Sequence, residues 1–128
     1  MLDYARLRTM EVLKAVRTAV LATSGPAGLQ ASEFACQAVG LYLYILVPQT
    51  SDHLFNLEHE TTVTLLAAGW ELKGQAQIVD PGTVDLELNL TQVPDAAWCA
   101  LVRITPCQVH IRREGGWGNI ETIDLKDL

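Results

Sequence analysis

Residues 47–66, with the sequence VPQTSDHLFNLEHETTVTLL, combine the residue types and spacing of an anion-binding site. Their order predicts the end of a strand, a short helix that opens at Ser51, and a further strand. The start of a helix attracts anions, because its first backbone N–H groups lack partners within the helix and the helix dipole is positive there. The same stretch holds three acidic residues, two histidines and no lysine or arginine. Its layout therefore predicts a phosphate site, whereas its charges oppose one.

The charge deficit extends well beyond this stretch, since no lysine or arginine occurs between Arg17 and Lys73. Asp52 follows Ser51 directly and would repel a bound phosphate. At an effective dielectric constant near 20, two unit charges about 4 Å apart interact with roughly 4 kcal/mol. A helix start at an exposed site contributes only about 1 kcal/mol. His53 would assist only when protonated, and the usual histidine pKa of about 6.5 leaves that form partial at neutral pH.

Other residue combinations predict neither a catalytic set nor a metal site. Residues 24–28, SGPAG, join two predicted strands, so we interpret them as a hairpin turn; a phosphate-binding glycine loop needs a helix after it. Cys107 and His110 lie three apart on a predicted strand and face opposite sides, so we expect no metal ion between them. Asp85 and Glu87 have the spacing of a solvated strand face, and no buried partner for acid–base chemistry is visible.

Two parts of the sequence leave their interpretation open. Trp117 lies in the glycine-rich segment EGGWGN, where it either covers the core or contacts a partner or a flat ligand. Residues 83–98 alternate apolar and acidic side chains like a strand, but a helix fits them as well.

Length and composition indicate one globular domain, residues 1–128, with 49% hydrophobic and 19% charged residues. The net charge of −6 argues against nucleic acid or an anionic membrane as the main partner. No apolar run is long enough to cross a bilayer and no signal peptide is evident, so we expect a cytoplasmic protein. The three cysteines form no short pairing pattern, and we expect reduced thiols, with Cys36 in the core.

Apolar periodicity predicts a mainly β protein behind an opening helix. Residues 3–17 place Leu7, Met10, Leu13 and Val16 at helical spacing, which predicts an apolar stripe packed on the core. Six or seven short strands with few helices indicate a closed or nearly closed small barrel, which leaves no exposed strand edges. The predicted strands are 18–23, 29–37, 39–48, 62–68, 70–79 and two final strands within 100–114 that meet at a bend at Thr105–Pro106.

The order of these pieces resembles the FMN-binding split-barrel family, the pyridoxamine 5'-phosphate oxidase-like proteins. The likeness covers most of residues 10–112. It rests on LAT before a glycine-containing hairpin, S-x-[basic]-x-x-N-L before a strand, GQA in a strand after WEL, and a closing VRITP. The resemblance implies a six-stranded antiparallel split β-barrel with an N-terminal helix and short connecting helices. It also implies a homodimer with FMN in grooves between the subunits.

The resemblance further implies a set of cofactor-binding positions. The second strand of the family lines the isoalloxazine ring of FMN, partly through backbone groups. The start of the short helix holds the phosphate through a serine and a basic residue, and in this sequence histidine takes the basic position. The implied positions are Ser32, Glu33, Phe34, Ala35, Ser51 and His53.

Two functions from different classes remain open. The first is an FMN-dependent oxidoreductase of unknown substrate, in which the protein positions the flavin and the flavin carries the chemistry. It requires a basic group near Ser51, for which Arg103, Arg112 and Arg113 are the candidates. The second is a flavin-free split-barrel homodimer that acts as a binding or regulatory module, or that takes a less charged flat ligand.

Overall fold

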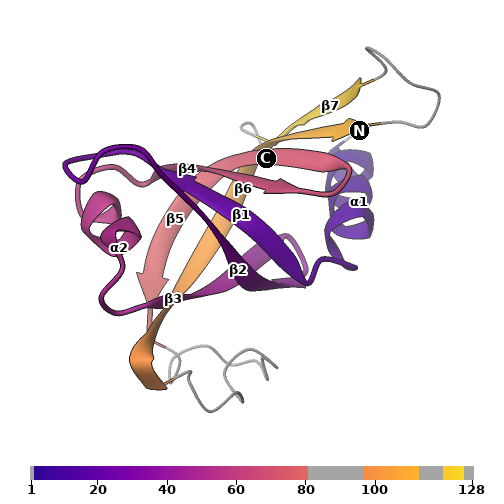
Figure 1. Cartoon of the computed structure of the whole chain (residues 1–128). Coiled ribbons are helices and arrows are strands. Elements are labelled where there is room, and N and C mark those ends of the chain that lie inside the picture. The colour runs from indigo at the N-terminus through magenta and orange to yellow at the C-terminus, as the bar shows by residue number, and fades with distance from the viewer. Residues whose placement is uncertain (1, 81–96, 113–119, 126–128) are drawn as a thin grey trace.

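The computed structural model describes residues 2–80, 97–112 and 120–125 of the chain. It shows a β-barrel with a helix at each of two opposite sides (Figure 1). In chain order the elements are α1 (Leu2–Leu13), β1 (Thr18–Thr23), β2 (Gln30–Val39), β3 (Tyr42–Pro48), α2 (Asp52–Leu57), β4 (Thr62–Ala67), β5 (Trp70–Val79), β6 (Cys99–Arg112) and β7 (Ile120–Asp124). Neither helix is long and apolar enough to cross a membrane, within the residues described.

The strands form one antiparallel sheet in the order β3-β2-β1-β4-β5-β6-β7. A further pairing between β3 and β6 closes the first six strands into a barrel, and β7 adds to the outer edge of β6. This confirms the predicted six-stranded antiparallel barrel with an N-terminal helix and a short connecting helix.

Strand β3 is shared unequally between its two neighbours. It pairs with β2 only from Tyr42 to Ile45, whereas it pairs with β6 from Leu43 to Pro48. Strand β2 begins at Gln30, so its residues before Cys36 pair with β1 alone among the described strands. The barrel is therefore open between β2 and β3 at this end.

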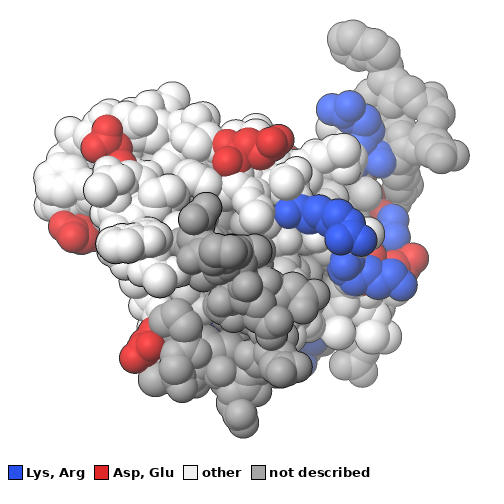
Figure 2. Space-filling model, turned by 60° about the horizontal axis from the view of Figure 1, so that its bottom comes forward, with Lys and Arg blue, Asp and Glu red and all other residues white. Residues whose placement is uncertain are grey.

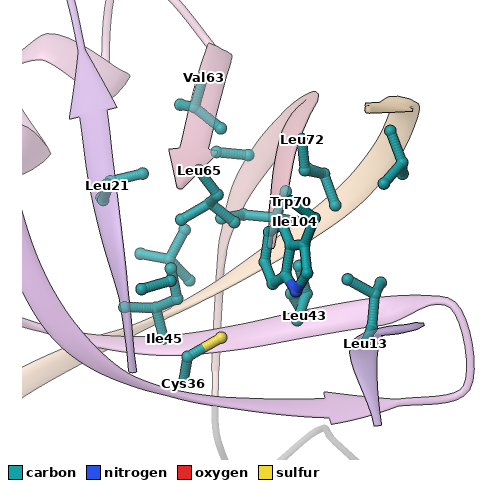
Figure 3. Packing of buried hydrophobic residues seen from close by; sticks show 14 of the residues in the cluster. Leu13, Leu21, Cys36, Leu43, Ile45, Val63, Leu65, Trp70, Leu72 and Ile104 are labelled. Carbon is teal, nitrogen blue, oxygen red and sulfur yellow. The ribbon is translucent and has the colours of Figure 1, made fainter. Parts of the chain in front are cut away.

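The core fills the barrel with alternate side chains of each strand. Leu21, Leu43, Leu65 and Leu72 are fully buried, and Figure 3 shows them meeting in the interior with Leu13 of α1. The strand alternation in the sequence predicts this arrangement, because successive strand residues face opposite sides of the sheet. Cys36 is buried as expected, and burial raises the pKa of its thiol to about 12.

Strand β6 differs from the expectation of two strands that meet at a bend. It runs continuously from Cys99 to Arg112, and its pairing with β5 shifts register between Lys73 and Gly74. The residue Pro106 pairs opposite Gly74, so the proline sits at a bulge where the ladder is already irregular. A Cβ on Gly74 would lie 2.6 Å from the carbonyl oxygen of Thr105, so only glycine permits this approach. Strand β7 was not predicted.

Helix α1 does not pack through the expected stripe of Leu7, Met10, Leu13 and Val16. Leu13 is buried and Val16 is partly buried against the core, but the side chain of Leu7 is 65% exposed and that of Met10 38%. Thr9 is fully buried instead, and its hydroxyl donates to the carbonyl oxygen of Ala5 at 2.8 Å. Thr9 can be buried against the barrel because this internal hydrogen bond offsets the cost of removing its hydroxyl from water.

Several positions left open by the sequence fall outside the described residues. These are residues 81–96, which include most of the ambiguous segment, and Arg113 and Trp117. The end of that segment is described, and the side chain of Trp98 is 75% exposed there.

The adjacent leucines of β4 provide a test of the barrel alternation. Leu65 is fully buried and Leu66 is 43% exposed. We expect Leu65→Ala to lower the free energy of unfolding by about 2–5 kcal/mol through a core cavity. Leu66→Ala should lower the free energy of unfolding of the monomer by about 0.5 kcal/mol or less. Urea unfolding of the two variants measures the difference, and equal losses would contradict the alternation.

Candidate ligand site at the split of the barrel

The predicted helix of the opening motif is α2, and Ser51 is its N-cap. Ser51 has an extended backbone, with φ −73° and ψ 139°, and its Oγ accepts a hydrogen bond from the backbone N–H of His53 at 3.1 Å. The carbonyl oxygen of Ser51 accepts from the N–H of Leu54 at 3.1 Å. The cap therefore occupies two N–H groups of the first turn, which a bound phosphate would otherwise find free.

His53 points into the protein and is 2% exposed. Its Nδ1 lies 2.8 Å from the hydroxyl of Thr23, and its Nε2 lies 3.0 Å from the hydroxyl of Ser32. The ring also meets Phe34 edge to face, with ring centroids 5.4 Å apart. His53 thus ties α2 to β1 and β2, at the end of the barrel where β2 lacks a second neighbour.

The direction of the hydrogen bonds follows from the buried hydroxyl of Thr23. Its Oγ1 accepts from the side-chain amide of Asn56 at 3.1 Å, and Thr23 is only 2% exposed. Its own hydrogen needs an acceptor, and Nδ1 of His53 supplies one. We therefore assign the ring proton of His53 to Nε2, which donates to Oγ of Ser32. The hydroxyl hydrogen of Ser32 is then left to donate to a further group, such as a ligand.

Asn56 of α2 holds the turn between β1 and β2 against the helix through hydrogen bonds to the backbone of the turn. It is fully buried, accepts from the backbone N–H of Ala27 at 2.9 Å, and donates to the carbonyl oxygen of Gly28 at 2.8 Å. A Cβ on Gly25 would lie 2.9 Å from Oδ1 of Asn56, so the glycine allows the turn to approach. The segment SGPAG is thus a hairpin turn, as predicted.

The four predicted positions on β2 divide between the two faces of the strand. Ser32 and Phe34 face the barrel end that holds His53, and both are partly buried. Glu33 and Ala35 are exposed, as alternation along a strand requires. The structure therefore brings Ser32, Phe34 and His53 together and turns the side chain of Glu33 away from them.

The backbone of β2 adds a second set of polar groups. The N–H of Cys36 donates to the carbonyl oxygen of Arg17 at 2.8 Å, which makes these two residues a hydrogen-bonded pair. In an antiparallel ladder such pairs alternate, so the backbone groups of Glu33 and Ala35 point away from β1. The pairing of β2 with β3 begins at Cys36, so the backbone groups of Glu33 face no described strand. The split therefore leaves a backbone donor and acceptor without a partner strand beside the Ser32 hydroxyl.

The electrostatics of this end are acidic to neutral. Burial lowers the pKa of His53 from its usual 6.5, against the opposing effect of Asp52, so the ring is neutral at pH 7. On the face in Figure 2, most acidic side chains lie on the left or at the top centre, whereas the lysines and arginines lie mostly toward the side of α1 in Figure 1.

The two described candidate arginines do not approach Ser51. Arg103 lies opposite Tyr44, four residues before the end of β3, or roughly 13 Å along the strand. It donates to Oε1 of Gln77 at 2.7 Å, and its guanidinium lies 5.1 Å from the ring centroid of Tyr42. Arg112 is at the far end of β6, where its N–H donates to Gly69. Neither Arg103 nor Arg112 of the same chain therefore completes a phosphate site at α2.

Comparison with solved structures supports the same architecture. General stress protein 26 from Bacillus anthracis aligns with 95% of this chain and 99% of its own, with a TM-score of 0.72 and 17% identity. A Clostridium acetobutylicum protein related to general stress protein 26, of the pyridoxinephosphate oxidase family, aligns with 99% of this chain and 98% of its own (TM-score 0.71, 12% identity). The chain has the split-barrel fold. The predicted resemblance is therefore confirmed at the level of the fold.

A FAD-binding protein from Mesorhizobium loti shares the fold as well. It aligns over 80% of this chain and 90% of its own, with a TM-score of 0.63 and 14% identity. The sequence matches no family model and no curated protein.

Sequence reasoning missed Thr23 and Asn56 as parts of the site. Both lie in motifs that carry the resemblance, LAT at residues 21–23 and the asparagine of the α2 motif. Their shared contact is the hydrogen bond between the two side chains, across 33 positions of sequence. The motifs could have indicated each residue separately. Their hydrogen bond to each other becomes visible only in the folded structure.

The buried state of His53 predicts a pH-dependent stability. Because its pKa is lowered in the folded protein, the unfolded chain binds the proton more readily. Stability should therefore fall as the pH drops below about 6.5, the usual histidine value. Urea unfolding at pH 7.5 and pH 5.5 measures this loss in the wild type and in His53→Gln.

The matched control is His59→Gln, since His59 is exposed and its Nδ1 contacts only the carbonyl oxygen of Phe55. We expect the control to keep the pH dependence of the wild type and His53→Gln to reduce it. An unchanged pH dependence in His53→Gln would refute the assignment.

Proposed function

We propose that this protein binds FMN through its isoalloxazine ring at the split beside β2, and acts as an FMN-dependent oxidoreductase on a small molecule. The observation that carries the proposal is the unpaired edge of β2 beside the free donor of Ser32. The fold supports it, because a FAD-binding protein is among the structures that share the split barrel.

The ring part of a flavin fits the groups at the split. The pyrimidine edge of the ring alternates carbonyl oxygens and an N–H, and the backbone N–H and carbonyl oxygen of Glu33 offer a complementary donor and acceptor. The hydroxyl of Ser32 adds a donor, and Phe34 adds an apolar surface. When bound, the flavin would supply hydride or electron transfer. The chain would hold the ring in position and keep the network behind Ser32 fixed.

The phosphate part fits the described residues less well. The Ser51 hydroxyl hydrogen is a donor nearby, but the cap already engages the N–H groups of His53 and Leu54, and the Asp52 carboxylate is adjacent. His53 is neutral, and both of its ring nitrogens are engaged. We therefore infer that binding energy comes mainly from the ring rather than from the phosphate.

A homodimer forms part of the proposal. The outer face of β1, β2 and β4 carries a run of small and apolar side chains that the barrel does not bury fully. Val20 pairs beside both Glu33 and Leu66, and Leu66 is 43% exposed. Such a face suits a two-fold contact between copies, the commonest route to oligomers. It lies next to the split, so a second chain would border the ligand site. The small and apolar members of this face are Val20, Ala22, Ala31, Ala35 and Leu66, and the exposed carboxylate of Glu33 lies among them, opposite Val20.

Comparison of FMN with riboflavin tests which part of the flavin is recognised. A single charge-assisted contact to the phosphate would stabilise binding by about 1.5–3 kcal/mol, or roughly 10- to 150-fold. We expect the two Kd values to agree within about 3-fold, measured by quenching of flavin fluorescence. Tighter binding of FMN by 10-fold or more would show that an arginine from elsewhere completes the site.

Ser32→Ala locates the site for both ligands. Loss of one neutral hydrogen bond should weaken FMN and riboflavin equally, by roughly 2- to 12-fold. Ser24→Ala is the matched control, because Ser24 is an exposed serine in the hairpin turn. Equal binding by the Ser32 and Ser24 variants would place the flavin elsewhere.

Leu66→Asp tests the homodimer. A buried, unpaired carboxylate at the centre of the outer face should convert a dimer to a monomer in sedimentation equilibrium. Ile78→Asp is the control, since Ile78 also lies on a strand and is 49% exposed. A monomeric wild type, or a Leu66→Asp variant that stays dimeric, would contradict the proposal.

The second candidate is a flavin-free split-barrel homodimer that serves as a binding or regulatory module. The acidic surroundings of α2 and the inward, neutral His53 favour it. A protein that purifies without a flavin band and quenches neither FMN nor riboflavin fluorescence would support this candidate over the first.

A further inference from the structure

A second cavity lies at the opposite end of the barrel from α2, between α1, the hairpin of β2 and β3, and the bend of β6. Its volume is about 590 Å³, within the roughly 300–1,000 Å³ typical of small-molecule sites. Arg6 and Met10 line it from α1, Tyr42 from the hairpin, and Thr105 and Pro106 from β6. Its walls are mostly apolar, and the polar side chains in them are those of Arg6, Tyr42 and Thr105.

The cavity owes its shape to two irregular features of the fold. Strand β6 bulges next to Pro106, because Gln108 pairs with Lys73 and Pro106 with Gly74, which leaves Cys107 without a partner on β5. Helix α1 packs on the barrel through Thr9 and Leu13, and Met10 remains 38% exposed at the cavity wall. Covering the exposed part of the Met10 side chain with an apolar ligand would remove it from water, which favours binding.

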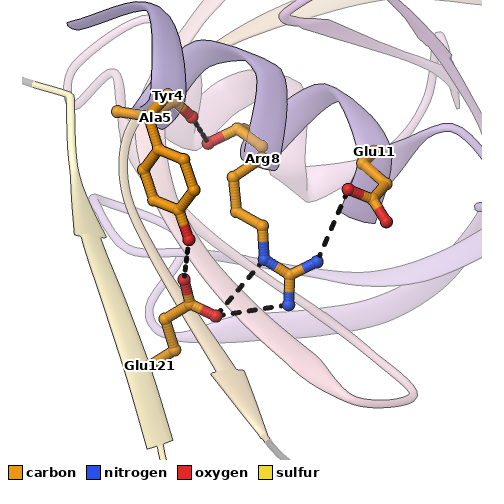
Figure 4. Close-up of polar contacts among 6 residues, drawn as sticks. Tyr4, Ala5, Arg8, Glu11 and Glu121 are labelled. Atoms are coloured by element: carbon orange, nitrogen blue, oxygen red, sulfur yellow. Dashed lines mark hydrogen bonds and ion pairs between the residues drawn. The ribbon is translucent and has the colours of Figure 1, made fainter. Parts of the chain in front are cut away.

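Arg6 is the one wall residue with a full charge, and it differs from its neighbour Arg8. Figure 4 shows Arg8 held by Glu121 of β7, at 3.2 Å, and by Glu11, at 3.8 Å. Arg6 makes no hydrogen bond or ion pair with the part of the chain that the structure describes. The helix therefore uses one arginine to anchor itself and leaves the other available to an anion.

A second arginine, Arg103, lies against a wall residue of the cavity and also favours a negatively charged ligand. The guanidinium of Arg103 lies 5.1 Å from the centroid of the Tyr42 ring, and Tyr42 lines the cavity. This end of the molecule also carries most of the lysines and arginines on the face in Figure 2, although the chain as a whole has a net charge of −6. The local field therefore favours an anion at this end.

We propose that this cavity is a second binding site, for an amphiphilic monoanion with an apolar body and a single carboxylate or sulfonate. The apolar walls take the body of the ligand, and Arg6 pairs with its acidic group. One free arginine matches a single negative charge, and a carboxylate can accept two parallel hydrogen bonds from a guanidinium. The site is separate from the split, so it does not depend on flavin binding.

Decanoate and its neutral counterpart 1-decanol provide the test. Isothermal titration well below micelle-forming concentrations should show one decanoate per chain. Arg6→Gln should weaken decanoate by about 3- to 10-fold, a range set by one partly exposed ion pair and its hydrogen bonds. The same variant should leave the binding of 1-decanol unchanged, because the alcohol carries no charge.

Two further variants separate the cavity from general surface effects. Lys14→Gln removes the same charge from an exposed position just beyond α1, outside the cavity, and should bind decanoate like the wild type. Met10→Trp fills part of the cavity from a half-exposed position and should weaken both decanoate and 1-decanol. Circular dichroism and the melting temperature confirm that the variants remain folded.

Three outcomes would overturn the proposal. One is the absence of saturable decanoate binding, and another is an equal loss of affinity in the Arg6 and Lys14 variants. The third is decanoate affinity that falls as protein concentration rises, together with a shift in sedimentation, since a second copy of the chain would then occupy the cavity.

Discussion

The pairing of β3 with β6 determines the rest of this structure. It joins the two ends of a six-stranded sheet, so the barrel encloses one core, while β2 and β3 keep unpaired edges along the split between them. The same pairing draws β3 away from β2 after Ile45. Closure therefore creates the split, and the exposed backbone beside Ser32 is a direct consequence of the topology rather than of a local motif.

The split is kept in shape by buried polar groups rather than by further strand pairing. Thr23, His53 and Asn56 come from β1 and α2, and each is almost completely removed from water. Their hydrogen bonds hold the hairpin turn, the helix and β2 together, and leaving one of them unpaired would cost about 1–3 kcal/mol. The hydrogen bonds run from Asn56 through Thr23 and His53 to Ser32, whose hydroxyl hydrogen is left to donate to a ligand. The buried polar network therefore orients the donor of the candidate site.

Local pattern predicted the strands well where side chains alternate regularly. β1 and β5 have the predicted bounds, because every second residue of each is apolar or small and faces the core. The prediction was wrong at β6, since a proline bulge in the middle of a strand looks like a strand end in sequence. It was also wrong along α1, where Thr9 satisfies its own hydroxyl and packs in place of a leucine.

The candidate site was predictable only in part, for a physical reason. The N-cap at Ser51 is a local interaction and follows from residue types three apart or fewer. The partners of His53 are 30 and 21 positions away in sequence, so their effect on its charge state depends on the complete fold. The sequence alone suggests that His53, in the basic position of the motif, is a weak cation. Its burial shows instead that it is neutral and joins Thr23 to Ser32 by hydrogen bonds.

The distribution of charge separates the two ends of the barrel chemically. The end with α2 is acidic on the surface and neutral inside, so it favours a ligand that presents hydrogen-bonding edges and little charge. The end with α1 holds Arg6 without an acid beside it, whereas the ion pair of Arg8 with Glu121 fixes the helix. An anionic ligand that samples both ends meets repulsion near Asp52 and attraction near Arg6. Electrostatics therefore favour weakly charged ligands at the split and anions at the cavity beside α1, in agreement with the two proposals.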